Sequence, residues 1–272
     1  MKIPKELYYI SKRAGKAIAQ YDMLHEGDKI LVAVSGGKDS LTLLDVLTYR
    51  QTFVPIHYQL IAVHIDSGIP GSSASLLQQH LASKDIPYHI EKIDIVQEGN
   101  WNDVNCFWCS WNRRKTLFQL ADKFGCNNVA LGHHMDDIIE TILLNLFFQG
   151  EISSMKPKQV LFEGKITIIR PLALEEEQNV TRYAKRSDLL KFDTSECPHN
   201  DNTKRTIVKN LIKQLEKINP DIKKNIFNSL QNIKRDYLLN EDGNKMPDIP
   251  ANKSLSQKIK KVLRDILQSP TI

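Results

Sequence analysis

A six-residue segment near the N-terminus, SGGKDS, has the composition of a loop that binds phosphate groups. It comprises Ser35, Gly36, Gly37, Lys38, Asp39 and Ser40, between an apolar β-branched run and an apolar helical pattern. Its two glycines let the backbone turn tightly, and the N-terminal end of the following helix attracts anions. Lys38 adds a positive charge, and the carboxylate of Asp39 can hold Mg²⁺ against phosphate oxygens. The segment differs from the Walker pattern but predicts a site for nucleotide phosphates.

Two cysteines, Cys106 and Cys109, form a C-x-x-C motif directly before a predicted helix. This spacing lets two thiolates converge on one metal or cluster, and the helix N-terminus favours their ionised form. A third candidate ligand is Cys197, whereas Cys126 fits better as a small buried side chain. Three such thiolates suit a [4Fe–4S] cluster with one iron left open. A redox pair, or a zinc site completed by His199, are the alternatives that the residues leave open.

Two adjacent carboxylates, Asp136 and Asp137, follow a pair of histidines where a predicted strand meets a helix. One of these aspartates is expected to cap the helix. The other can stand beside Asp39 at the nucleotide, as a magnesium ligand or a general base. The histidines, His133 and His134, fit hydrogen-bonding roles better than zinc ligation, because no carboxylate–histidine spacing accompanies them.

Arginine and tryptophan side chains surround the C-x-x-C motif. Arg113 and Arg114 fall on the first turn of the predicted helix, where they could neutralise thiolates, a cluster or phosphates, or simply face solvent. Trp101, Trp108 and Trp111 fit core or cluster-shielding positions, and one of them could stack on a flipped base.

Strand-like and helical patterns alternate through the first half of the chain. Strands are expected at 29–34, 58–66, 88–94 and 128–133, and helices at 3–25, 41–47, 73–84, 110–124 and 136–148. Parallel strands need crossover helices, so this alternation predicts an α/β fold with a doubly wound parallel sheet. In such sheets, ligands bind beyond the carboxyl ends of the strands.

The second half of the chain has a different pattern, which predicts a mainly helical C-terminal part. A hairpin is expected at 158–171 with Glu163 and Gly164 at its turn, followed by helices near 175–187, 204–218, 221–240 and 254–267. We therefore divide the chain into a nucleotide-binding core at 1–150, a second part at 151–240 and an extension at 241–272.

The composition places the chain among soluble proteins of a reducing compartment. It has 272 residues, of which 41% are hydrophobic and 25% charged, and it contains no apolar run long enough to span a membrane. We expect no signal peptide, because the N-terminal segment lacks an apolar core. Four cysteines in a chain of this length favour a metal or redox site, and hence the cytoplasm, over a disulfide framework.

Positive charge is concentrated in the last quarter of the chain. From Asp201 to Ile272 there are 15 Lys and Arg against 8 Asp and Glu, whereas the whole chain has a net charge of +5. A basic tail on a near-neutral body predicts a polyanionic partner, held by residues such as Lys204, Arg205 and Lys209. A merely solvated helical surface is the alternative.

The segment SGGKDS resembles the pyrophosphatase loop (PP-loop) of enzymes that split ATP between its α and β phosphates. The resemblance implies an adenine nucleotide α-hydrolase fold in which the loop grips the departing pyrophosphate. It also implies that the backbone at the end of the second strand, at Val63 and His64, contacts the adenine. Gly132, which ends the fourth strand, would lie at the same edge.

Four further segments resemble the family of tRNA 2-thiocytidine synthetases: CFWCSWNRRKTLF, GHHMDDIIETILLNLFFQGEISSMKPK, ITIIRPL and CPHNDNTKR. With the loop, the resemblance runs from about 25 to 215. It implies that Cys106, Cys109 and Cys197 are the three ligands of a [4Fe–4S] cluster. By the same resemblance Asp137, rather than its neighbour, is the carboxylate at the nucleotide, and we group it with Asp39 and Arg113 as the catalytic residues.

The resemblance implies an ATP-dependent reaction on a cytidine of the tRNA anticodon loop. The cytidine O2 attacks the α-phosphorus of ATP bound with Mg²⁺, and sulfur then replaces the adenylate, leaving 2-thiocytidine and AMP. Its expected partners are tRNA and a sulfur donor such as a cysteine desulfurase. We expect no membrane partner, and the protein could form a homodimer. Two alternatives remain: an adenylating enzyme with structural zinc at the cysteines, and a non-catalytic module that binds nucleotide or RNA.

Overall fold

The computed structural model of the chain describes residues 3–68, 74–93, 106–192, 204–234 and 237. Compact packing divides the chain into two units, Met1–Leu230 and Gln231–Ile272. The first unit contains all the helices and strands discussed below. The helix expected at 254–267 lies outside the described residues. Among the helices that the structure describes, none combines the length and the apolar character needed to cross a membrane.

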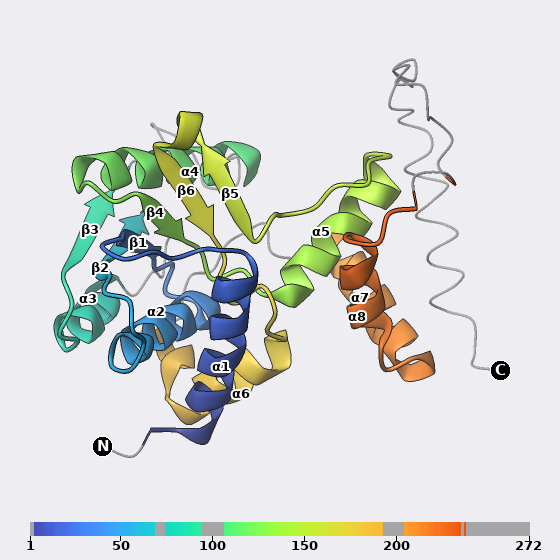
Figure 1. Cartoon of the computed structure of the whole chain (residues 1–272), viewed down its shortest axis with the longest axis horizontal. Coiled ribbons are helices and arrows are strands. Elements are labelled where there is room, and N and C mark those ends of the chain that lie inside the picture. The colour runs from blue at the N-terminus through green and yellow to red at the C-terminus, as the bar shows by residue number, and fades with distance from the viewer. Residues whose placement is uncertain (1–2, 69–73, 94–105, 193–203, 235–236, 238–272) are drawn as a thin grey trace. The chain divides into compact units, whose positions relative to one another are not determined.

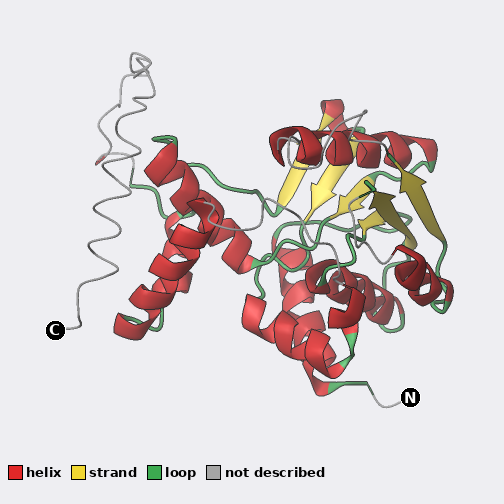
Figure 2. Ribbon diagram, turned by 180° about the vertical axis from the view of Figure 1, so that it is seen from behind, coloured by secondary structure: helices red, strands yellow, loops and turns green. Residues whose placement is uncertain are grey.

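Six strands form one sheet in the order β3-β2-β1-β4-β6-β5 (Figures 1 and 2). The strands are β1 (Lys29–Ala33), β2 (Gln59–Asp66), β3 (Tyr88–Lys92), β4 (Asn128–Ala130), β5 (Lys158–Leu161) and β6 (Ile166–Ile169). Every neighbouring pair is parallel except β5 and β6. The predicted α/β fold with a parallel sheet is therefore confirmed, and so is the hairpin, whose turn includes the short 3₁₀ segment η2 (Phe162–Gly164).

Helices cover both faces of this sheet. The described helices are α1 (Lys5–Gln20), α2 (Lys38–Gln51), α3 (Ala74–Ala82), α4 (Cys106–Lys123), α5 (Met135–Phe148), α6 (Glu177–Arg186), α7 (Lys204–Ile218) and α8 (Ile222–Ser229). Of these, α5, α7 and α8 pack on one another beside the sheet rather than on its faces. Figure 1 shows α4 on one face and α1, α2 and α3 on the other. Because both faces are covered, the central strands read as continuous apolar runs.

Strand β1 shows how one strand supplies two cores. Ile30 and Val32 point into the cluster formed with α1 and α2, whereas Leu31 points into the cluster formed with α4. Side chains alternate between the faces of a strand, so consecutive apolar residues serve opposite cores. All three are fully buried. A third apolar cluster joins α5, α7 and α8.

Two features of the second half of the chain differ from the sequence analysis. β6 pairs with β4 inside the parallel sheet, so the sheet crosses the boundary that was drawn at residue 150. The helix expected at 221–240 is shorter than predicted and ends at Ser229. Asn228 and Asn232 lie at this end, and asparagine favours turns over helix interiors because its side chain competes for backbone hydrogen bonds.

Candidate functional site

A cavity of about 340 Å³ lies at the carboxyl ends of β1, β2 and β4. We call it the strand-end cavity. Its lining includes the sequence-predicted site residues Ser35, Asp39, Ser40, Val63, Arg113, Gly132 and Asp137. Apolar walls come from Val34, Ile65, Leu117, Phe118, Val129 and Leu131. An apolar pocket with a few convergent polar groups at this edge of a parallel sheet is the arrangement typical of a nucleotide site.

The phosphate loop turns sharply between the end of β1 and the start of α2. Gly36 has φ +92°, a conformation that a residue with a side chain rarely adopts. The Ser40 hydroxyl donates to the carbonyl of Gly37 (2.9 Å) and accepts a hydrogen bond from the backbone N–H of Ser35 (3.1 Å). The loop is thus closed by its own hydroxyl groups, and α2 begins at Lys38 with its N-terminus at the loop.

Gly132 allows β4 and α2 to approach each other at the cavity. A Cβ atom at this position would lie 2.9 Å from both the carbonyl carbon of Asp39 and the backbone nitrogen of Ser40. Contacts of this length to backbone atoms cannot be relieved by rotating a side chain. A glycine is therefore required for the end of β4 to touch the first turn of α2.

The carboxylate of Asp39 is suited to binding a cation. Its Oδ2 accepts a hydrogen bond from Lys38 Nζ (3.1 Å), and its Oδ1 is buried and has no hydrogen-bond partner among the described residues. His134 Nε2 lies 3.7 Å from that Oδ1. Burial raises the pKa of Asp39, and the charge of nearby Asp137 adds to this rise. A buried carboxylate oxygen without a partner fits the ligand set that Mg²⁺ prefers.

Lys38 is held by two carboxylates. Its Nζ lies 3.1 Å from Asp39 Oδ2 and 3.1 Å from Glu177 Oε1, on the first turn of α6. Glu177 Oε2 in turn lies 3.3 Å from Lys209 Nζ on α7. Burial alone would raise the pKa of Glu177, but the charges of the two lysines and the hydrogen bond from Lys38 outweigh it and lower this pKa to about 2. Glu177 therefore stays ionised between the phosphate loop and α7.

The two neighbouring aspartates have different surroundings. Asp137 lines the strand-end cavity, and its Oδ2 accepts a hydrogen bond from the backbone N–H of His134 (3.0 Å) at the start of α5. Asp136 lies outside the cavity, where its Oδ2 accepts from the backbone N–H of Glu177 (2.8 Å) and its Oδ1 pairs with Lys223 Nζ (2.8 Å). Asp137 thus caps its helix and faces the cavity at once.

Of the two residues expected to contact the adenine, Val63 lines the cavity and His64 does not. Val63 lines the cavity, and its carbonyl accepts a hydrogen bond from the backbone N–H of Val34 (2.8 Å). His64 is buried, with Nδ1 2.8 Å from the carbonyl of Val34, and it does not line the cavity. Burial lowers the pKa of His64, which favours a neutral ring.

Three residues in or near the cavity were not among the site residues chosen from the sequence. Arg114 lines the cavity beside Arg113, and His133 lines it from the end of β4. Arg170 Nε donates to His133 Nδ1 (3.2 Å), and burial lowers the pKa of His133 to about 4. The third, Glu177, touches the loop lysine although it lies 139 positions away. No local pattern marks Glu177, because its role depends on how α6 packs.

The cysteines are described only in part. Cys106 is the first residue of α4, and Cys109 follows it three positions later in the same helix. Cys197 and His199 lie outside the described residues, and so does the side chain of Cys106. Among the described residues, no three His, Cys, Asp or Glu side chains cluster to hold a metal ion. Cys126 is buried in an apolar cluster, and burial raises the pKa of its thiol, as expected for a core residue.

Two tryptophans on α4 form an exposed aromatic pair. The rings of Trp108 and Trp111 stack with centroids 5.6 Å apart and planes inclined by 15°. They are 53% and 45% exposed, so neither is the core residue that the sequence favoured. Lys115 Nζ lies 5.3 Å from the ring centre of Trp111. Trp101 lies outside the described residues.

Comparison with known proteins identifies the family. The PP-loop domain family matches residues 9–216. The tRNA-cytidine(32) 2-sulfurtransferase of Paracidovorax citrulli is 40% identical over 88% of this chain and 79% of its own length. The enzyme of the same name from Geotalea uraniireducens is 41% identical over 85% of this chain and 93% of its own length.

A solved structure shares the fold. The U34-tRNA thiolase NcsA from Methanococcus maripaludis, determined with its [4Fe-4S] cluster, superposes with a TM-score of 0.68. It is 24% identical, and the match covers 84% of this chain and 78% of that chain. The motifs, the strand-end cavity and these matches agree: the chain belongs to the PP-loop family and, within it, to the tRNA-cytidine(32) 2-sulfurtransferase family of enzymes.

Proposed function

We propose that the chain uses ATP to activate a cytidine of the tRNA anticodon loop and replaces its O2 with sulfur. The observation that carries this proposal is the strand-end cavity, which is lined by the phosphate loop, by Asp39 and Asp137, and by the helix of the C-x-x-C motif. The names of the relatives, which act on tRNA cytidine 32, support the choice of substrate.

Two bond exchanges make up the proposed reaction. The cytidine O2 attacks the α-phosphorus of ATP, and the bond to the departing pyrophosphate breaks. The persulfide sulfur of a donor, such as a cysteine desulfurase, is first reduced by two electrons from a thiol reductant. The resulting sulfide-level sulfur bonds to the ring carbon, and the carbon–oxygen bond breaks with release of AMP. Adenylation comes first because the oxygen of an amide-like carbonyl is a poor leaving group.

Residues of the cavity have distinct roles in this proposal. Backbone N–H groups of Ser35–Ser40 and the N-terminus of α2 hold the phosphates, with Lys38 as the cation. Asp39 and Asp137 would hold Mg²⁺, and the unpartnered Oδ1 of Asp39 fits that role. Arg113 stabilises the charge that develops at the α-phosphate. Val63, His64 and Gly132 form the edge at which we place the adenine.

The cysteines would hold a [4Fe–4S] cluster. Cys106 and Cys109 lie one turn apart at the N-terminal end of α4, which favours their thiolate forms. Cys197 is proposed as the third ligand. When bound, the cluster supplies an iron without a protein ligand, at which sulfur can be carried. A reduced thiolate site also fits the cytoplasm as the place of action.

Replacing the cysteines tests the proposal. In anaerobically reconstituted protein, Cys106→Ser, Cys109→Ser and Cys197→Ser should each remove bound iron and acid-labile sulfide and abolish thiolation. Each should spare ATP binding, because the phosphate loop uses other residues. Cys126→Ser is the matched control, since this buried cysteine is expected to leave the iron content unchanged.

The outcome with His199→Ala separates cluster from zinc. If it and Cys197→Ser lose metal equally and that metal is zinc, the site is a closed structural one and the sulfur-transfer half of the proposal is wrong. Release of AMP and pyrophosphate without thiolation would then identify an adenylating enzyme. Absence of AMP release from the wild-type protein would contradict the proposal altogether.

A further inference from the structure

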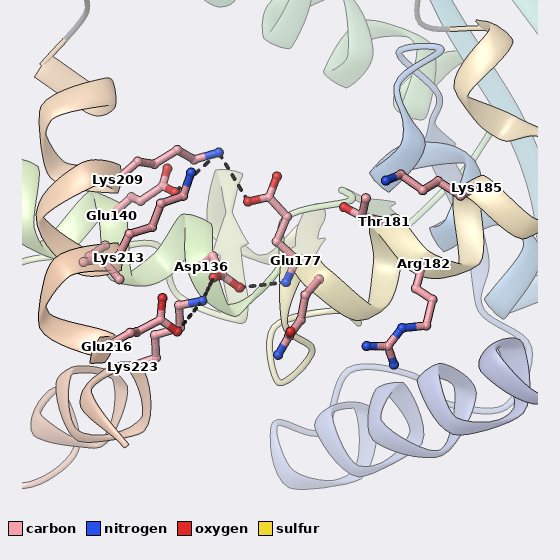
Figure 3. A pocket seen from close by; sticks show the side chains of 12 residues that line it. Asp136, Glu140, Glu177, Thr181, Arg182, Lys185, Lys209, Lys213, Glu216 and Lys223 are labelled. Carbon is pink, nitrogen blue, oxygen red and sulfur yellow. Dashed lines mark hydrogen bonds and ion pairs between the residues drawn. The ribbon is translucent and has the colours of Figure 1, made fainter. Parts of the chain in front are cut away.

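A second hollow, of about 550 Å³, lies between α6 and α7, with residues of α5 and α8 at its side. We call it the α6–α7 groove. Figure 3 shows Thr181, Arg182 and Lys185 on one wall and Lys209 and Lys213 on the other, with Glu177 between them. The groove is separate from the strand-end cavity, since the two linings share no residue.

The acidic side chains of the groove are already neutralised. Lys223 Nζ lies 2.8 Å from Asp136 Oδ1 and 2.9 Å from Glu216 Oε1. Glu140 Oε2 lies 3.0 Å from Arg205 Nε. Glu177 is held between Lys38 and Lys209, as described above. The carboxylates therefore leave little negative charge to repel an anion.

Three cations of the groove are not paired with its carboxylates, although Arg182 lies near Glu6 of α1 and its charge helps to lower the pKa of that group. Arg182, Lys185 and Lys213 are exposed, and none forms an ion pair with any residue in the part of the chain that the structure describes. On α6, Lys185 is a neighbour of both Thr181 and Arg182, because it follows them by four and three positions. Lys213 faces them from α7 (Figure 3). The groove thus presents positive charge from two walls.

We propose that the α6–α7 groove binds backbone phosphates of the RNA substrate, through Arg182, Lys185 and Lys213. The inference rests on the proposed function, which supplies RNA as the polyanion. No aromatic side chain of the described residues lines the groove, so these residues offer nothing for a base to stack on and suit the sugar-phosphate backbone. Glu177 lines the groove and touches Lys38, so RNA held there lies beside the phosphate loop.

This assignment differs from the expectation drawn from the basic tail. Arg205 and Lys209 pair with Glu140 and Glu177, and Lys204 Nζ lies 4.9 Å from the ring centre of Phe148. Their charges are engaged within the protein. Two of the three cations proposed here, Arg182 and Lys185, come instead from α6, which precedes the basic tail in the sequence.

The test is tRNA binding as a function of salt. Arg182→Ala, Lys185→Ala and Lys213→Ala should each weaken binding about three- to tenfold and reduce the log–log slope by about 0.7–0.9. Lys165→Ala is the charge-matched control: this exposed lysine lies directly before β6, at the end of the sheet opposite the carboxyl ends of the parallel strands, and it should leave affinity and slope unchanged. ATP affinity without RNA should be the same in all four variants. Thermal unfolding midpoints establish that each variant is folded.

The outcomes separate this inference from the proposed function. If the wild-type protein binds no tRNA, both fail. If the wild-type protein binds and thiolates tRNA, but the three groove variants keep its affinity and slope, the groove inference is overturned and the proposed function stands. Equal losses of tRNA affinity in the groove variants and in Lys165→Ala would mean that positive charge anywhere on the surface suffices for tRNA binding. This result would also overturn the groove inference.

Discussion

The strand-end cavity and the α6–α7 groove are two hollows built in opposite ways. The cavity is shaped by backbone: a left-handed glycine, a strand end without a Cβ atom and the first turn of a helix. The groove is shaped by long charged side chains from helices that are distant in the sequence. A site for bond chemistry needs atoms fixed within fractions of an ångström, whereas a site for a polymer backbone needs mainly charge.

The contrast between the two hollows can be tested most sharply at the phosphate loop. Lys38→Ala and Asp39→Ala should each reduce the rate of thiolation by at least about 100-fold, because a preorganised group at the phosphates is worth about 3 kcal/mol in the transition state. Iron content should not change. Single-turnover rates at saturating tRNA measure this, with Lys213→Ala as the control that alters affinity and leaves the saturated rate near that of the wild type. Near-normal AMP formation by Asp39→Ala would refute its assignment.

Close backbone packing is the second point at which the cavity should be sensitive. Gly132→Ala places a Cβ atom 2.9 Å from the backbone of α2, and relief of that contact should cost about 1–3 kcal/mol in the free energy of unfolding. It should also move the phosphate loop and lower kcat. Gly164→Ala is the matched control, because it strains a turn at φ +95° but meets no atom. If both variants lose stability and activity in parallel, Gly132 has no special part in the site.

The groove has a pH dependence of its own. Burial raises the pKa of Glu140 from 4.5 to about 7, despite the opposing charges of Lys209 and Arg205. The folded protein then binds more protons than the unfolded chain between pH 4.5 and 7, so this group lowers stability as pH rises through that window. Glu140→Gln should reduce this pH-dependent loss of the free energy of unfolding by on the order of 1–2 kcal/mol. Urea unfolding at pH 5 and pH 7 measures this loss of stability. An equal loss in the variant and the wild-type protein would contradict the assignment of the raised pKa to Glu140.

The smallest expected effect lies at the border between the two hollows. Glu177→Gln removes the negative charge that competes with phosphates for Lys38, so ATP should bind a few-fold more tightly, by less than about 1 kcal/mol. Isothermal titration with a non-hydrolysable ATP analogue tests this. Glu216→Gln, a groove carboxylate that pairs with Lys223, should have no effect on ATP affinity. Weaker binding by Glu177→Gln would mean that Glu177 positions Lys38 rather than competing for it.

The same contrast explains what could be predicted from the sequence. Ser35–Ser40 could be identified because a contiguous motif creates its own local geometry between a strand and a helix. The carboxyl edge of the sheet then brought Asp137 and Arg113 to the same cavity, as parallel topology requires. The pairing of Lys38 with Glu177, and of β6 with β4, depends on packing between distant segments. No periodicity within either segment encodes it.

Helix α4 acts as a rigid spacer. Cys109 and Arg113 are four residues apart on it, so they share a face and are separated by about 6 Å along the axis. The distance from the C-x-x-C motif to the cavity wall is therefore set by the pitch of a helix rather than by a loop. Inserting one alanine between them would lengthen the spacer by only about 1.5 Å but rotate its ends by about 100°. We expect nucleotide binding at the phosphate loop to survive such an insertion. Thiolation, which under the proposed function needs the C-x-x-C motif and the cavity to face each other, should be lost.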